Sequence, residues 1–152
     1  MEKKLRYSWN PKVTSGLSKE EGGKQTYGWS FTETDWVEND VIEIIRTRSY
    51  NPSELKDGHK VLTKVLGVYN VVLDFDKNDP TLLEFLEEAR KWRFSWVAHT
   101  TINHQKEKIN PATKLAEPGT AVDKFRAIIP LATQISNAEY ELSVEFWLKK
   151  FP

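Results

Sequence analysis

Two aspartates stand two residues apart at the end of an apolar segment, residues 71–76, which reads Val-Val-Leu-Asp-Phe-Asp. Side chains alternate between the two faces of a β-strand, so Asp74 and Asp76 would share one face while Leu73 and Phe75 pack on the other. Neighbouring ionised carboxylates repel each other, and a divalent cation relieves that repulsion. The spacing favours a metal site, and its alternative is a strand that ends in a polar turn.

A histidine and an arginine occur in comparable places further along the chain. His104 ends the segment 100–104, Thr-Thr-Ile-Asn-His, and Arg126 lies in the segment 124–131, Lys-Phe-Arg-Ala-Ile-Ile-Pro-Leu. A histidine at a strand end is, by itself, more often structural than functional. A guanidinium among apolar side chains needs an anionic partner, which is either an acid of the fold or a phosphate.

The elements that would position these residues follow from apolar periodicity and turn signals. In the first half, Thr32 and Asp35 resemble a capping box that opens a helix. Gly67 separates two strand-like segments that could form a hairpin. The pattern predicts short strands within 3–9 and 24–31, a helix over 34–48, and strands over 59–66 and 68–76.

In the second half, Asp79 and Pro80 suit the N-cap and first residue of a helix that reaches about Trp92. Ser136 and Glu139 form a capping box that opens the last helix. A long polar segment, 103–123, lies between two strands, and such a loop is uncommon in a compact domain unless it is functional or mobile. The two strands are predicted over 94–102 and 125–131.

This order of elements predicts an α+β fold. We expect a two-layer, RNA-recognition-like (ferredoxin-like) module with a mixed or antiparallel sheet, helices on one face and an open catalytic face. The acids would project from the open face, because Leu73 and Phe75 are the residues that favour the core.

Composition limits the possible functions. The 152 residues suit a single domain, 1–152. There is no cysteine, and Lys plus Arg (22) balance Asp plus Glu (22), so no overall basic excess indicates nucleic-acid binding. The sequence shows neither a signal-peptide pattern nor an apolar run of membrane-spanning length, which predicts a cytoplasmic protein with no membrane partner.

Taken in order, the motifs Leu-Asp-Phe-Asp (73–76), Thr-Thr-x-x-His (100–104) and Arg-x-Ile-Ile-Pro-Leu (126–131) resemble the archaeo-eukaryotic primase superfamily. The likeness is closer to the primase-polymerase domains of plasmid and phage replication proteins, and it covers about the second half of the chain. The resemblance implies metal-dependent addition of nucleotides on a DNA template during replication, with nucleoside triphosphates and in some cases an RNA primer as partners.

The resemblance also assigns roles. Asp74 and Asp76 would hold Mg²⁺ or Mn²⁺, His104 would contact the triphosphate as part of the catalytic set, and Arg126 with Lys124 would bind the nucleotide. Such phosphoryl transfer needs positioning and electrostatics rather than a covalent nucleophile.

One departure concerns the third carboxylate of the family. It normally lies on a strand after the last helix seen here, so the chain would be an N-terminal part of the catalytic domain of a larger replication protein, or a shortened relative. Asp123 and Glu117 precede the arginine strand and do not match that position. We therefore expect weak or no polymerisation by the isolated chain.

Three alternatives remain. The first is a nucleic-acid-binding or replication-initiation module without catalysis, which would stack bases on the aromatic residues Tyr7, Trp9, Tyr27 and Trp29. The second is a replication-initiation nuclease with His99 and His104 as metal ligands and Tyr140 as nucleophile. The odd separation of the two histidines disfavours it, because they would face opposite sides of a strand. The third is a structural subunit that keeps the fold without the activity.

Overall fold

The structure is a computed structural model that describes residues 3–13, 19–77, 80–101 and 104–151. The chain divides into two compact units. Unit 1 comprises Met1–Val71 and Ile129–Ser143, and unit 2 comprises Val72–Ile128 and Val144–Pro152. The observed elements make an α+β fold with a curled antiparallel sheet, compatible with a ferredoxin-like module.

Unit 1 begins with an antiparallel pair of strands, β1 (Lys4–Trp9) and β2 (Ser30–Asp35). A short helix, α1 (Lys19–Lys24), lies between them in the sequence, and α2 (Glu38–Thr47) follows β2. Next come β3 (Ser53–Leu55) and two 3-10 turns, η1 (Lys56–Gly58) and η2 (Leu62–Lys64). The core of this unit includes buried apolar side chains of these elements, among them Leu5, Tyr7, Val41, Ile44 and Leu55.

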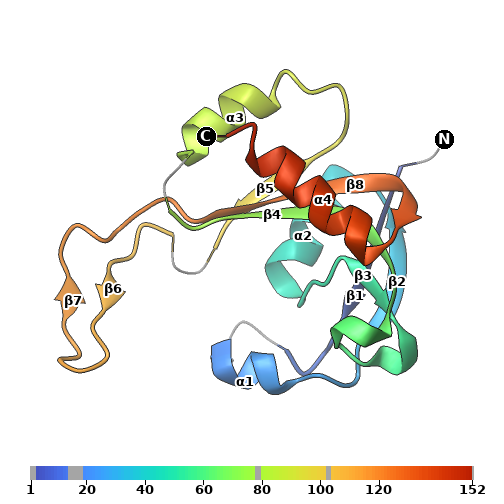
Figure 1. Cartoon of the computed structure of the whole chain (residues 1–152), viewed down its shortest axis with the longest axis horizontal. Coiled ribbons are helices and arrows are strands. Elements are labelled where there is room, and N and C mark those ends of the chain that lie inside the picture. Colours follow the sequence, from blue (N-terminus) through green and yellow to red (C-terminus); the bar gives the residue numbers. More distant parts are fainter. Residues whose placement is uncertain (1–2, 14–18, 78–79, 102–103, 152) are drawn as a thin grey trace. The chain divides into compact units, whose positions relative to one another are not determined.

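The larger sheet has the strand order β3-β4-β8-β5, with β4 spanning Val65–Phe75, β8 spanning Phe125–Ile135 and β5 spanning Val97–Thr100 (Figure 1). The register pairs β3 with β4 and β5 with β8 in antiparallel fashion. The Tyr69 hydroxyl bonds Gln134 at 2.8 Å, and Asp74 bonds Arg126, so the start of β4 lies beside the end of β8. The two long strands therefore also run antiparallel.

Unit 2 is built on an aromatic core. Phe75 of β4 and Phe125 of β8 stack with ring centroids 4.6 Å apart, and Phe85 of α3 (Leu82–Ala89) lies 5.4 Å and 5.2 Å from them. Phe151, which follows α4 (Asn137–Leu148), contacts Phe85 at 5.3 Å. Within this unit, the helix α3 thus packs on one face of the strands, as the sequence predicted.

The alternation predicted for the acid-bearing strand is confirmed. Leu73 is fully buried and Phe75 is 4% exposed, while Asp74 is exposed. The capping box at Ser136 is confirmed as well, because the Ser136 backbone N–H and hydroxyl donate to Glu139 at 2.7 Å. The helix that follows is α4.

Other predictions differ from the structure, and most of the predicted strands 24–31 and 59–66 lie outside the observed strands. Thr32 and Asp35 lie within β2, so they do not cap a helix, and α2 begins only at Glu38. The segments around Gly67 are not a hairpin, because β4 runs straight through this glycine. The helix predicted from Pro80 begins at Leu82, where Thr81 is the N-cap in a capping box with Glu84; Asp79 lies outside the described residues.

The long polar segment is partly ordered into a small antiparallel ribbon of β6 (Lys108–Ile109) and β7 (Ala116–Glu117). Asn110 organises the turn between them, since its side chain accepts from the Ala112 backbone at 2.9 Å and donates to Glu117 at 3.1 Å. In the part of the chain that the structure describes, no helix has both the length and the apolar character needed to cross a bilayer.

Candidate functional site

Asp74 and Arg126 meet on the polar face of unit 2. The guanidinium donates twice to the carboxylate, from Nε to Oδ1 and from Nη2 to Oδ2, each at 2.8 Å. The strands fix this pair, because β4 and β8 are neighbours and Phe75 and Phe125, adjacent in sequence to the pair, anchor the opposite face. The Asp74 side chain remains 50% exposed and that of Arg126 35% exposed, so solutes can reach both.

His99 joins this pair from the third strand. It lies directly opposite Arg126 in the antiparallel register of β5 and β8, which places both side chains on the same face. Its Nδ1 lies 3.1 Å from the Thr100 carbonyl oxygen. If Nδ1 carries the proton, it donates that hydrogen bond and leaves Nε2 as the acceptor nitrogen. Burial lowers the pKa of His99, and the positive charge of Arg126 acts in the same direction, so the imidazole is neutral near pH 7.

Solvent reaches only part of this face. Ile128 follows Arg126 by two residues on the same face of β8, yet it is completely buried. Asp74, Arg126 and His99 lie where solvent does reach this face. Asp76 is exposed and lies one residue beyond the end of β4, so strand pairing does not orient its side chain as it orients Asp74.

His104 is held by residues that immediately precede β8, the strand that carries Arg126. Its Nδ1 accepts from the Lys124 backbone N–H at 3.2 Å and lies 3.9 Å from Oδ1 of Asp123. The Lys124 carbonyl accepts from the Thr101 backbone N–H at 2.9 Å. The structure therefore brings His104 and Lys124 together two residues before Arg126, while Asp74, Arg126 and His99 form the neighbouring group on the strands.

Asp123 has a structural task. Its carboxylate accepts from the Leu82 backbone N–H, at the start of α3, at 2.7 Å, and also from the Gln105 side chain. The Leu82 bond is the main cause of a lowered pKa for Asp123. Glu117 bonds Asn110 within the β6–β7 ribbon. Both acids that precede the arginine strand are thus occupied in holding local structure.

The donor set on the polar face suits a divalent cation only in part. No group of three or more carboxylate, imidazole or thiol side chains with metal-binding geometry occurs among the described residues. Mg²⁺, however, is commonly held by one or two carboxylates together with substrate phosphates and water. A carboxylate offers about four lone-pair sites, so the two bonds from Arg126 leave acceptor capacity on Asp74. Asp74 and Asp76 thus offer two carboxylates, fewer ligands than a cation site built from protein side chains alone would need.

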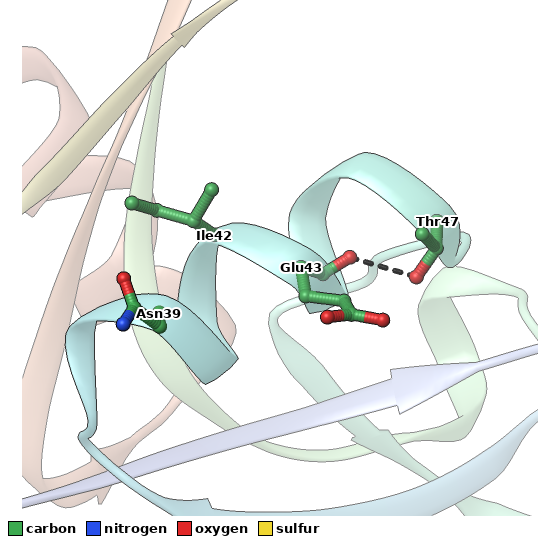
Figure 2. Close-up of a pocket in the computed structure, with 4 residues that line it drawn as sticks. All are labelled: Asn39, Ile42, Glu43 and Thr47. Atoms are coloured by element: carbon green, nitrogen blue, oxygen red, sulfur yellow. Dashed lines mark hydrogen bonds between the residues drawn. The ribbon is translucent and has the colours of Figure 1, made fainter.

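A surface hollow lies elsewhere, on α2 in unit 1 (Figure 2). It is lined by Asn39, Ile42, Glu43 and Thr47, and the Thr47 hydroxyl donates to the Glu43 carbonyl at 2.7 Å. One carboxylate among an amide, a hydroxyl and an apolar side chain provides no evident catalytic pair. We assign no chemistry to this hollow.

Comparison of the chain with protein-family models, with curated proteins and with solved structures gives no match.

Sequence reasoning missed His99 as a neighbour of Arg126. It considered this histidine only as a metal ligand together with His104. The signal that finds it is cross-strand register, since His99 and Arg126 each lie two residues from Thr101 and Lys124, which flank the two strands and are hydrogen-bonded to each other. For the binding-module alternative, Tyr7 and Trp29 are excluded as base-stacking residues because they are 1% and 5% exposed.

Proposed function

We propose that the polar face of unit 2 binds a nucleoside triphosphate together with Mg²⁺ or Mn²⁺, as part of a primase-polymerase-type nucleotidyltransferase that works on a DNA template. The observation that carries the proposal is the grouping of Asp74, Arg126 and His99 on three adjacent strands, opposite an aromatic core. The motif resemblance supplies the reaction class.

Each residue has a role that its chemistry permits. Asp74 and Asp76 would hold the cation, which when bound would neutralise phosphate charge and polarise the phosphoryl group. Arg126 presents a fork of N–H donors that matches phosphate oxygens as well as carboxylates. A triphosphate would compete with Asp74 for this fork, which would free carboxylate oxygens for the cation. The pair would thus exchange partners when substrate binds.

The two histidines would serve orientation. His99 is neutral near pH 7 and lies beside Arg126, so it can hydrogen-bond a phosphate or ribose oxygen without adding charge. His104 accepts from the Lys124 backbone at Nδ1, which leaves its Nε2–H as a donor when the ring is neutral. Both would position the substrate, and neither is needed as a nucleophile.

The test is a titration with Mn²⁺, with and without a nucleoside triphosphate, of wild type and Asp74→Asn. We expect wild type to bind Mn²⁺ and nucleotide cooperatively and Asp74→Asn to weaken nucleotide-dependent Mn²⁺ binding at least tenfold. Asp40→Asn is the matched control, since Asp40 is an exposed aspartate of α2. Equal binding by wild type and Asp74→Asn would refute the proposal.

A second candidate is a nucleic-acid-binding module without catalysis. It is favoured by the fact that Arg126 already bonds both oxygens of Asp74, as expected for a purely structural ion pair. In that case Asp74→Asn would hold nucleic acid as well as wild type or better, because a negative charge is removed, and no nucleotide-dependent Mn²⁺ binding would occur.

A further inference from the structure

An exposed aromatic stack lies in unit 1, outside the site described above. The Tyr27 ring stacks on the His59 imidazole with centroids 3.9 Å apart and an interplanar angle of 14°. Tyr27 is 65% exposed, although a tyrosine of this size usually finds more cover. With one ring face against His59 and 65% of the residue exposed, Tyr27 keeps surface that a flat ligand can reach.

The backbone around the stack is firmly held. The segment that carries Tyr27 bonds the segment that carries His59 twice, from Trp29 N–H to the Gly58 carbonyl at 3.1 Å and from Lys60 N–H to the Thr26 carbonyl at 2.6 Å. The buried Asn10 side chain donates to the Tyr27 carbonyl at 2.8 Å. The two rings are therefore presented by a preorganised scaffold, which lowers the entropic cost of binding.

The segment that carries His59 is locally basic. Residues 56–64 contain Lys56, Lys60 and Lys64 against the single acid Asp57. Nζ of Lys60 lies 4.5 Å from the centroid of the Trp29 ring. Its charge is therefore next to the backbone segment that carries Tyr27. Although the whole chain is neutral, Lys60 places a positive charge beside the segments that present Tyr27 and His59.

We propose that the Tyr27–His59 stack is a base-stacking site for single-stranded nucleic acid. An exposed, prearranged aromatic ring beside lysines combines the two features by which proteins bind single strands, stacking on base faces and neutralisation of phosphates. Double-stranded DNA is a poor ligand for it, since paired bases are not free to stack on a side chain. The inference goes beyond the proposed function, because it concerns different residues in unit 1 and holds without catalysis.

The test is fluorescence anisotropy with labelled oligothymidylate and oligouridylate, which distinguishes DNA from RNA as the preferred strand. Tyr27→Ala should weaken binding of the preferred strand by roughly 5-fold to 150-fold, the range for loss of one stacked base. Tyr27→Phe keeps the ring and should stay within about twofold of wild type. Phe146→Ala, which removes another exposed aromatic ring, is the matched control and should leave binding unchanged.

A second measurement does not depend on a variant that folds. Photo-cross-linking with a bromouridine-substituted oligonucleotide, followed by tryptic digestion and mass spectrometry, should mark Tyr27 in the peptide 25–46. Equal affinities of wild type and folded Tyr27→Ala for both strands, or cross-links confined to other peptides, would overturn the inference.

A failure of the Tyr27–His59 stack to bind single strands is distinguishable from a failure of the nucleotide and metal site in unit 2. Tyr27→Ala should leave nucleotide-dependent Mn²⁺ binding at its wild-type level. Asp74→Asn tests only the site in unit 2. Loss of Mn²⁺ and nucleotide binding in Asp74→Asn, together with unchanged strand binding in Tyr27→Ala, would refute the stack and keep the proposed function.

Discussion

The two faces of the strands β4, β8 and β5 within unit 2 are built in opposite ways. One face carries Phe75 and Phe125, which are 4% and 0% exposed and pack on Phe85. The other carries Asp74, Arg126 and His99, and the ion pair there remains substantially exposed. An exposed ion pair contributes about 1 kcal/mol or less to stability, whereas burying aromatic rings contributes several. The aromatic face therefore maintains the fold, and the polar face is available for binding.

The largest effect on stability is expected on the aromatic face. Phe85→Ala removes a fully buried ring that contacts Phe75, Phe125 and Phe151, and should lower the free energy of unfolding by about 3–5 kcal/mol. Urea denaturation followed by tryptophan fluorescence measures this loss. Phe146→Ala, at a phenylalanine that is 55% exposed, should cost less than about 1 kcal/mol. Equal losses in the two variants would contradict the assignment of the core.

The next largest effect on stability is expected for Asp123, whose carboxylate holds the start of α3. Asp123→Ala removes a charged acceptor from the start of α3 and should cost about 1.5–3 kcal/mol at pH 7. Because the folded state lowers the pKa of Asp123, its contribution is present above the unfolded pKa of about 4 and is lost as pH falls through the folded value.

Urea denaturation of wild type and Asp123→Ala at pH 7 and pH 3 measures this dependence. The difference between the two proteins should shrink at pH 3. Asp123→Asn keeps an acceptor oxygen without the charge and should fall between them at pH 7. A difference that is the same at both pH values would show that the carboxylate charge is irrelevant to α3.

A smaller effect on stability is expected at acidic pH, and it comes from His99 on the polar face. The folded state lowers the pKa of His99, so between about pH 6.5 and the folded value the unfolded chain binds the proton more readily. Wild-type stability should therefore fall as pH decreases from 6.5, and His99→Gln should lose that part of the slope. Stability curves at several pH values between 5 and 7 measure it. Parallel curves would mean that His99 is freely solvated.

The smallest effect on stability is expected for the ion pair itself. Arg126→Met should change the free energy of unfolding by about 1 kcal/mol or less, because both side chains are partly exposed. The same variant should raise the pKa of His99, since the Arg126 charge opposes protonation of that ring. An NMR titration of the imidazole measures the shift, and Arg126→Lys, which keeps the charge, is its control. An unchanged His99 titration in Arg126→Met would show that the Arg126 charge does not act on the His99 ring.

Local patterns predicted the parts of the fold that depend on local chemistry. The alternation of Leu73, Asp74 and Phe75 follows from strand geometry, and the Ser136–Glu139 cap satisfies backbone groups within one helical turn. Thr32 and Asp35 have the same spacing as a cap, but they pair with Tyr7 and Lys4 of β1 instead. A pattern three residues long could not reveal that distant partner.

Gly67 was misleading for a different reason. Glycine usually marks a turn, but here the Gln134 side chain lies over it, and a Cβ at position 67 would come within 2.7 Å of Oε1 of Gln134. The glycine allows close approach of a neighbouring strand's side chain, so the strand continues. For the candidate site, the spacing of the two aspartates singled out Asp74 and the apolar neighbours of Arg126 singled out that residue, whereas the place of His99 emerged only from the register of β5 with β8.

Gly58 limits how this chain can diverge. It has φ +61°, and a Cβ there would come within 2.5 Å of the Trp29 carbonyl oxygen. Any other residue would force apart the two segments that present Tyr27 and His59. A distant homologue that kept the Tyr27–His59 stack should therefore combine Tyr-Gly-Trp with a later Gly-His dipeptide. This combination is a sequence signature by which such homologues can be sought.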